Sequence, residues 1–323
     1  MTDFVAVDIG GTHARFALAS AQAGRVTKLG KEVTLKTAEH ASLQTAWEEF
    51  GRVSGQALPR AAAIAIACPV AGEVLKLTNN PWIIRPARIG DKLKVDRFTL
   101  INDFEAVGHA VACADAAHFT HLCGPDLPLP TTGLISIIGP GTGLGVASVW
   151  RDGDDYRVQA SEGGHIDFAP LDSIEDAILA RLRQRYRRVS VERVISGPGI
   201  VEIYEALAAI EDRAVKTMDD KTLWPLALSG TDSLAAAAAD RLCLSLGSVA
   251  GDITLAQGGA ATVIAGGLGL RLKDTLARSG FAERYRAKGR FEGLMASLPV
   301  KLITHPEPGL FGAATAFAKD HAS

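Results

Sequence analysis

Short apolar runs divide the first third of the chain, and most of them end at glycine or proline. Residues 4–9 and 14–19 are apolar with β-favouring side chains, and two glycines lie between them, which predicts two strands joined by a tight turn. A third strand is expected at residues 33–36. Residues 61–67 form a continuous apolar run, which is typical of a strand covered on both faces.

Stretches of helical spacing separate these runs. Residues 38–53 carry apolar side chains at the spacing of one helix face, and Gly55 follows them. Residues 98–103 predict a further strand that brings Asn102 and Asp103 to its carboxyl end. Because strands alternate with helices, we expect an α/β sheet, and such sheets bind ligands beyond the carboxyl ends of their strands.

The strand, glycine turn and strand of the N-terminus occur a second time. Residues 134–150 read LISIIGPGTGLGVASVW, about 130 positions after the first copy. The simplest account is two domains of related construction. The remaining pattern predicts helices at about 173–188 and 232–255, an apolar run broken by paired glycines at 261–268, and a closing strand and helix.

Composition and charge narrow the class of protein. The chain has 323 residues, of which 47% are hydrophobic and 22% charged, with a formal net charge of −2. These values fit a soluble globular protein. Because charges of both signs are interspersed, the sequence shows no basic patch that would bind nucleic acid or an anionic membrane. Met1 leads directly into the first predicted strand without a basic or long apolar leader. We therefore expect a cytoplasmic protein.

The cysteines favour a reducing compartment, because none of them shows C-x-x-C spacing: Cys68, Cys113, Cys123 and Cys243. Two of them lie with three histidines within residues 109–123. That spacing matches no zinc pattern, so we favour ordinary packing over metal binding.

The two glycine turns are candidates for phosphate binding. Glycine lets backbone N–H groups approach a ligand closely, and Thr12 and Thr142 lie beside the glycines. An acid next to a phosphate would be repelled without a cation between them, so Asp8 predicts Mg²⁺ held mostly through water. The alternative is a plain hairpin in which Asp8 bonds to the amides of its own turn.

Asp103 is the candidate catalytic base. A carboxylate at the end of a buried strand can accept the proton of a hydroxyl that attacks phosphorus. The alternative is that Asp103 caps a helix beginning in NDFEAVGHA. Glu162 and His165 of EGGH, together with Glu192, add polar groups that suit a ligand with several hydroxyls, although each is also common on ordinary surfaces.

The motifs DIGGTHAR, TNNPW, INDFEAV, GPGTGLGV, EGGHIDFAP, ERVISGPG and AGGL follow one another along the whole chain. In this order the sequence resembles the bacterial glucokinases, in the group that lacks the zinc-binding cysteine motif. The resemblance implies an actin-like ATPase (ribonuclease H-like) α/β fold with two domains flanking a deep cleft. It places residues 1–113 and 304–323 in a small domain and 114–303 in a large one.

The resemblance also implies roles for individual residues. The nucleotide and its metal are assigned to the following positions: Asp8, Gly10, Gly11 and Thr12 in the first phosphate loop with Asp8 toward Mg²⁺, Gly141, Thr142 and Gly143 in the second loop, and Gly266 and Gly267 beside the adenosine. The glucose is assigned to Asn102, Asp103, Glu162, His165 and Glu192, with Asp103 as the base.

The implied reaction transfers the γ-phosphate of ATP to the 6-hydroxyl of D-glucose, the first step of glycolytic glucose use. We expect glucose to close the two domains, which would shield ATP from water. The resemblance further implies a homodimer.

Three other readings remain. A related kinase could prefer another hexose or use polyphosphate as donor. A sugar-responsive repressor of this fold would need a DNA-binding segment before the first strand, which starts near Phe4 here. A non-catalytic actin-like assembly protein would leave INDF and EGGH without a role.

Overall fold

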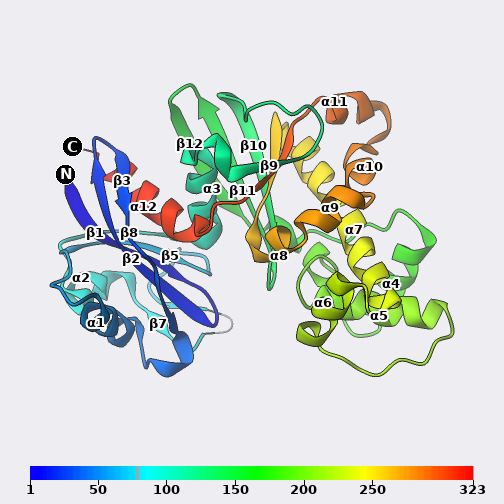
Figure 1. The fold of residues 1–323 in the computed structure, drawn as a ribbon, viewed down its shortest axis with the longest axis horizontal. Helices are drawn as coiled ribbons and strands as arrows, with labels where there is room; N and C mark the ends of the chain where they lie inside the picture. The colour runs from blue at the N-terminus through cyan, green and yellow to red at the C-terminus, as the bar shows by residue number, and fades with distance from the viewer. Residues whose placement is uncertain (78–79, 323) are drawn as a thin grey trace. The chain divides into compact units, whose positions relative to one another are not determined.

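The computed structural model describes residues 1–77 and 80–322, and contacts between Cα atoms divide them into two compact units. Unit 1 comprises residues 1–114, 158–160 and 305–323, and unit 2 comprises 115–157 and 161–304. Each unit contains one six-stranded sheet with helices packed on it (Figure 1).

The sheet of unit 1 has the strand order β3-β2-β1-β5-β8, and β4 also pairs with β2. Its strands are β1 (Thr2–Ile9), β2 (His13–Gln22), β3 (Arg25–Leu29), β4 (Val33–Lys36), β5 (Ala61–Ile66) and β8 (Arg97–Asn102). The hairpin β1–β2 is antiparallel, whereas β1, β5 and β8 run parallel. Strand β5 is buried at all of its positions, as the continuous apolar run predicted.

Helices cover both faces of this sheet. The helices of unit 1 are α1 (Leu43–Ser54), α2 (Ile89–Leu93), α3 (Asp103–Cys113) and the C-terminal α12 (Pro308–Asp320). Side chains of α1 and α2 pack on one face with the alternate positions of β1 and β5, and α12 packs on the other. A short ribbon of β6 (Leu75–Lys76) and β7 (Ile83–Ile84) lies outside the main sheet.

The sheet of unit 2 has the order β12-β11-β10-β13-β14-β9. Its strands are β9 (Phe119–Cys123), β10 (Thr132–Pro140), β11 (Leu144–Asp152), β12 (Asp155–Ser161), β13 (Ala261–Ile264) and β14 (Val300–Ile303). Strands β10 and β11 form an antiparallel hairpin, and β13 and β14 continue from β10 in parallel. Unit 2 thus repeats the hairpin followed by parallel strands of unit 1, which confirms the two predicted strand-turn-strand segments.

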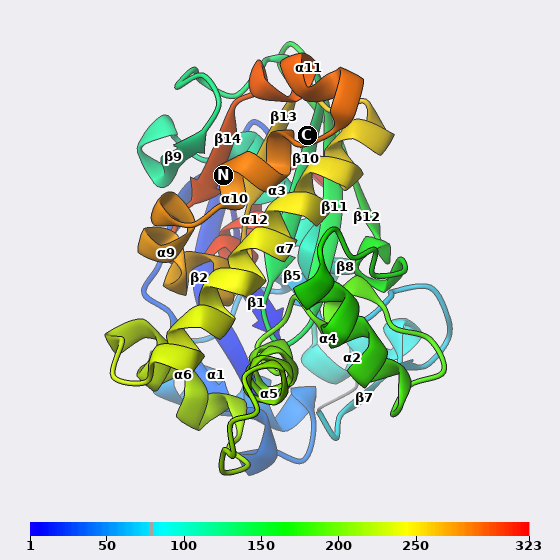
Figure 2. The ribbon, with the colours of Figure 1, turned by 90° about the vertical axis from the view of Figure 1, so that its right-hand side faces the viewer.

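Several of the helices of unit 2 pack against α7, as Figure 2 shows. The helices of this unit are α4 (Ser173–Arg183), α5 (Gly199–Ile210), α6 (Asp220–Ser229), α7 (Ser233–Gln257), α8 (Gly266–Arg271), α9 (Lys273–Arg278), α10 (Phe281–Arg286) and α11 (Glu292–Ala296). Among the described residues, α7 alone is long and apolar enough to cross a membrane, but 72% of its most apolar stretch is buried inside the protein. That burial is expected of a core helix.

Two helix boundaries and one strand differ from the sequence prediction. Helix α1 starts at Leu43 and not near residue 38, because Ser42 and Thr45 form a capping box there. Helix α4 ends at Arg183, five residues before the predicted end. Strand β3 was not predicted, because Arg25–Leu29 is a mostly exposed edge strand without a continuous apolar face.

Candidate active site

The first glycine turn connects β1 to β2 at the carboxyl edge of the unit 1 sheet. The Gly10 N–H donates to the His13 carbonyl at 2.9 Å and closes the turn. Thr37 holds the turn through two hydrogen bonds. Its hydroxyl donates to the Gly11 carbonyl at 3.0 Å, and its N–H donates to the Thr12 carbonyl at 3.0 Å. Within the described residues, the N–H groups of Gly11 and Thr12 donate to no other group. Two adjacent amides are therefore available to an anion.

Asp8 precedes this turn and is largely buried. Its carboxylate is 17% exposed and lies 3.6 Å from the Arg15 guanidinium, the residue opposite it in the β1–β2 register. Burial raises the pKa of Asp8, while the charge of Arg15 acts in the opposite direction. Within the described residues, Arg15 alone forms an ion pair with Asp8, so an added cation beside this carboxylate would be stabilised.

Asn102 and Asp103 lie at the same edge as Asp8, because β1, β5 and β8 are parallel neighbours. The register aligns Ile9 with Ile66 and Ile66 with Asn102, so the ends of the three strands coincide. Asp103 is the first residue of α3. The strand ends therefore bring two carboxylates together, as the parallel sheet predicted.

The helix cap at α3 is Asn102 and not Asp103. The Asn102 side-chain oxygen accepts hydrogen bonds from the N–H groups of Phe104 at 2.9 Å and Glu105 at 3.3 Å. Its amide donates to the Cys68 carbonyl at 3.2 Å. Asn102 thereby fixes the start of α3 and the direction of the neighbouring Asp103 side chain.

Asp103 holds its proton more tightly than an ordinary carboxylic acid. Burial and then the charge of Asp8 raise the pKa of Asp103 to about 6, against the opposing hydrogen bond from the Phe104 N–H. A carboxylate with this pKa is ionised at neutral pH and is basic enough to accept a proton from a reacting hydroxyl.

Sequence reasoning missed a group of charged residues around Asp8. Arg15 lies 3.3 Å from Glu307 and 3.9 Å from Glu32. Burial raises the pKa of Glu307 to about 7, and a hydrogen bond with Glu32 adds to the increase. Arg15 thus has the carboxylates of Asp8, Glu32 and Glu307 around it, and no local motif could bring Glu307 into this group.

Gly309 and Asn80 complete the surroundings of the first turn. A Cβ atom at Gly309 would lie 2.6 Å from an Asp8 carboxylate oxygen, so only glycine lets α12 approach Asp8 this closely. The Asn80 amide donates to the Gly10 carbonyl at 3.0 Å. Asn80 belongs to the TNNPW motif, whose first two residues, Thr78 and Asn79, lie outside the described residues. The repeated glycines of PGLFG were the only available sequence signal for Gly309.

The second glycine turn connects β10 to β11 in unit 2. The Gly141 N–H donates to the Gly143 carbonyl at 2.8 Å, and the Gly141 carbonyl accepts from the Gly197 N–H at 2.7 Å. In the part of the chain that the structure describes, the N–H groups of Thr142 and Gly143 have no acceptor. This turn repeats the pair of free amides of the first turn.

Glu192 fastens this second turn from the side. Its carboxylate accepts a hydrogen bond from the Leu144 N–H at 2.8 Å, and a Cβ at Gly143 would lie 2.4 Å from the same carboxylate. The sequence assigned Glu192 to the glucose. In the structure, the Glu192 carboxylate is hydrogen-bonded to the end of the second glycine turn.

The EGGH segment and Gly266 pack against the same hairpin. A Cβ at Gly164 would lie 2.1 Å from the Leu144 carbonyl, and one at Gly266 would lie 2.5 Å from the Pro140 carbonyl. Gly266 has a φ of +77° at the start of α8, and Gly267 beside it faces open space. The Glu162 and His165 side chains are 71% and 55% exposed, 3.9 Å apart. Gly141, Thr142 and Gly143 thus form the β10–β11 turn, and Gly164, Glu192 and Gly266 pack against its hairpin.

We expect Gly143→Ala to lower the free energy of unfolding by about 1–2 kcal/mol, because the added methyl displaces Glu192 from Leu144. Gly141→Ala is the matched control, since a Cβ there meets nothing within 4 Å. Chemical denaturation of both variants measures the difference. Equal stability of the two variants would show that the hydrogen bond between Glu192 and Leu144 does not stabilise the turn.

Comparisons with known proteins agree with this arrangement. The glucokinase family model matches residues 5–320. A glucokinase from Zymomonas mobilis is 61% identical over 319 residues, which cover 99% of this chain and 98% of the relative.

Solved structures show the same likeness. The crystal structure of a glucokinase from an Antarctic psychrotroph has a TM-score of 0.85 and 31% identity, with 98% of this chain and 99% of that chain covered. A ROK family glucokinase from Streptomyces griseus, solved in complex with glucose and AMPPNP, has a TM-score of 0.62 and 19% identity, with 97% and 98% covered. With the actin-like ATPase fold and full-length similarity to enzymes that phosphorylate glucose, the chain belongs to the glucokinase family.

Proposed function

We propose that this glucokinase transfers the γ-phosphate of ATP to the 6-hydroxyl of D-glucose, with Asp103 as the general base. The observation that carries the proposal lies at the carboxyl edge of unit 1. There a carboxylate with a pKa of about 6 begins α3, at the end of a strand parallel to β1, whose own end leads into the turn with two free amides. Proton acceptance and phosphate binding are the two functions that this transfer requires.

Asp103 accepts the proton of the 6-hydroxyl as that oxygen attacks the γ-phosphorus. Asn102 holds Asp103 in place through the cap of α3, and the amide pairs of the two glycine turns stabilise charge on the phosphates. The glucose ligands we propose are Asn102, Glu162, His165 and Glu192, besides Asp103. Gly266 and Gly267 accommodate the adenosine.

Asp8 fits a magnesium ion that is held mostly by water and phosphate oxygens. Within the described residues, no group of three or more His, Cys, Asp or Glu side chains could hold a metal, so the protein supplies few ligands. That donor set suits Mg²⁺, which usually keeps several waters and binds substrate phosphates. The ion would neutralise phosphate charge, and Asp8, fixed by Arg15 and by the close approach of Gly309, would orient its water shell.

The supporting proposals concern the setting of the reaction. We propose a cytoplasmic homodimer that acts in the first step of glycolytic glucose use, without nucleic-acid or membrane partners. Units 1 and 2 correspond in this proposal to the small and large domains of residues 1–113 with 304–323 and 114–303.

A donor and acceptor panel tests the proposed reaction. We expect glucose 6-phosphate from ATP, Mg²⁺ and glucose, with much lower rates for other hexoses and for polyphosphate as donor. Removal of Mg²⁺ with a chelator should abolish turnover, and added Mg²⁺ should restore it. A higher kcat/KM with polyphosphate or with another hexose would overturn the assignment of donor or acceptor.

The pH dependence of glucose phosphorylation should report the ionisation of Asp103. We expect kcat/KM to be constant above about pH 7 and to fall tenfold per pH unit below about pH 6, because the protonated carboxyl accepts no further proton. Initial rates at glucose concentrations well below KM, measured from pH 5 to pH 8, give kcat/KM at each pH. Constant kcat/KM down to pH 5 would contradict Asp103 as the base.

A further inference from the structure

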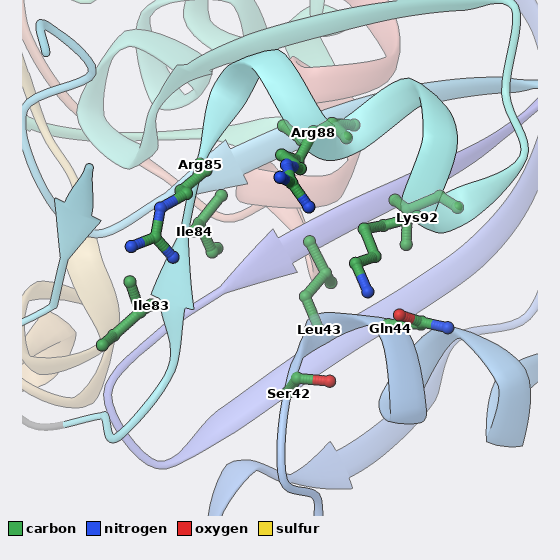
Figure 3. Close-up of a pocket in the computed structure, with 10 residues that line it drawn as sticks. Ser42, Leu43, Gln44, Ile83, Ile84, Arg85, Arg88 and Lys92 are labelled. Atoms are coloured by element: carbon green, nitrogen blue, oxygen red, sulfur yellow. The ribbon is translucent and has the colours of Figure 1, made fainter. Parts of the chain in front are cut away.

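Unit 1 contains a cavity that shares no residue with the proposed active site. Its volume is about 440 Å³, within the range of roughly 300–1,000 Å³ that is usual for small-molecule sites. The cavity lies between the start of α1 and the segment that runs from β7 into α2 (Figure 3). Its inner wall is apolar and buried, formed by Leu43, Ile84, Ile89 and Leu93.

Three cationic side chains line the outer part of the cavity. Arg88 and Lys92 reach from the α2 side toward Leu43 and Gln44, and Arg85 lies beside Ile83 (Figure 3). Within residues 1–77 and 80–322, no carboxylate forms an ion pair with any of the three.

Two exposed arginines elsewhere in unit 1 do have acidic partners. Arg52 pairs with Glu49 and Arg60 with Asp96, each with an N–O distance of 2.6 Å. Three unpaired cations around one hollow, in a chain of net charge −2, are therefore a local excess of positive charge.

We propose that this cavity binds a small organic phosphate, with the phosphate at Arg85, Arg88 and Lys92 and the organic part on the aliphatic wall. Guanidinium groups match phosphate oxygens with paired N–H donors, and an ammonium adds a point charge. The buried Leu43, Ile84, Ile89 and Leu93 side chains offer no hydrogen bonds, so they suit an apolar or ring-shaped body.

The wall of the cavity is linked to the first glycine turn. Trp82 directly precedes Ile83, and its indole N–H donates to the His40 carbonyl at 2.8 Å. The Asn80 oxygen accepts from the Trp82 N–H at 2.9 Å, while the Asn80 amide donates to the Gly10 carbonyl at 3.0 Å. The indole N–H of Trp82 is therefore a reporter for occupancy of the cavity.

Phenyl phosphate is the probe, because it joins a phosphate to a flat apolar ring. We would titrate it into ¹⁵N-labelled protein and follow the Trp82 indole resonance, assigned with Trp82→Phe, with calorimetry for the affinity. We expect saturable binding that weakens at least tenfold in the double variant Arg88→Gln/Lys92→Gln. Inorganic phosphate and phenol should each bind at least tenfold more weakly than phenyl phosphate.

The matched control removes the same two charges elsewhere in unit 1. Arg25→Gln/Lys28→Gln changes exposed residues of β3 that form no ion pair with any described residue and do not line the cavity. This variant should keep the wild-type affinity, and thermal unfolding of both variants shows that they fold. Equal loss in the control, unchanged binding in Arg88→Gln/Lys92→Gln, or inorganic phosphate binding as tightly as phenyl phosphate would each overturn the proposal.

Discussion

Asp103→Asn is expected to lower kcat for glucose phosphorylation by about 10²–10⁴-fold while glucose binding stays within about threefold of wild type. Asparagine has nearly the same shape and can still accept the Phe104 N–H through its carbonyl oxygen. It cannot take the proton of the 6-hydroxyl. Coupled assay of glucose 6-phosphate and glucose titration by tryptophan fluorescence measure the two quantities.

Glu105→Gln is the control for this substitution, since it neutralises a carboxylate in the same first turn of α3. It should retain kcat within about threefold. Turnover by Asp103→Asn within tenfold of wild type would reduce Asp103 to a structural residue of the helix start. Loss of glucose binding in the same variant would assign Asp103 to recognition and not to proton transfer.

The same substitution should stabilise the protein above pH 6. Folding raises the pKa of Asp103 from 3.8 to about 6, so the native state binds more protons than the unfolded chain between these values. Stability therefore decreases as the pH rises through this window, and the ionised carboxylate is a cost of about 3 kcal/mol at pH 7.5 that Asn removes. Denaturation at pH 7.5 should show the gain. A lower stability of Asp103→Asn at this pH would contradict the desolvation of the carboxylate.

Gly312→Ala should lower the free energy of unfolding by about 3 kcal/mol. A Cβ at Gly312 of α12 would lie 1.7 Å from the Ala106 carbonyl of α3. Because the obstacle is backbone, relief requires that one helix moves, which also disturbs the start of α3. Urea unfolding, with hydrogen exchange of the β1 amides as a local reporter, measures the loss.

Gly51→Ala provides the comparison for a helical glycine with space around it. A Cβ there would lie 3.4 Å from the Leu58 side chain, an ordinary contact. Alanine also restricts the unfolded chain, so this variant should be more stable than wild type by about 0.5–1 kcal/mol. A Gly312→Ala protein with wild-type stability would show that α12 and α3 shift apart at little cost.

Local patterns predicted those parts of the fold whose physical cause is local. The hairpins at residues 4–19 and 134–150 follow from apolar runs interrupted by glycine, and both are present. The buried β5 follows from its continuous apolar run. The sequence left open which residue of the NDF segment caps α3, because Asn and Asp are both good helix caps. The hydrogen bonds in the structure show that Asn102 is the cap.

The charged surroundings of the candidate site were beyond sequence reasoning. Arg15, Glu32 and Glu307 come from elements far apart in the chain, and the sequence contains no rule that pairs them. The position of Glu192 illustrates the same limit. Its assignment to the glucose came from the family resemblance, whereas its hydrogen bond to Leu144 could be seen only in three dimensions.

The position of α12 determines the order in which the two units can fold during synthesis on the ribosome. Phe4 of the first strand stacks on Phe317 of the last helix with ring centroids 4.4 Å apart, and Leu310, Ala313 and Ala314 fill the same core. The core of unit 2, by contrast, uses only residues between Cys123 and Leu302. Unit 2 can therefore fold once Leu302 has left the ribosome, whereas the sheet of unit 1 is covered on both faces only after α12 has emerged. A nascent chain cut short before α12 would carry an exposed apolar sheet face, which marks it for proteolysis before it could act.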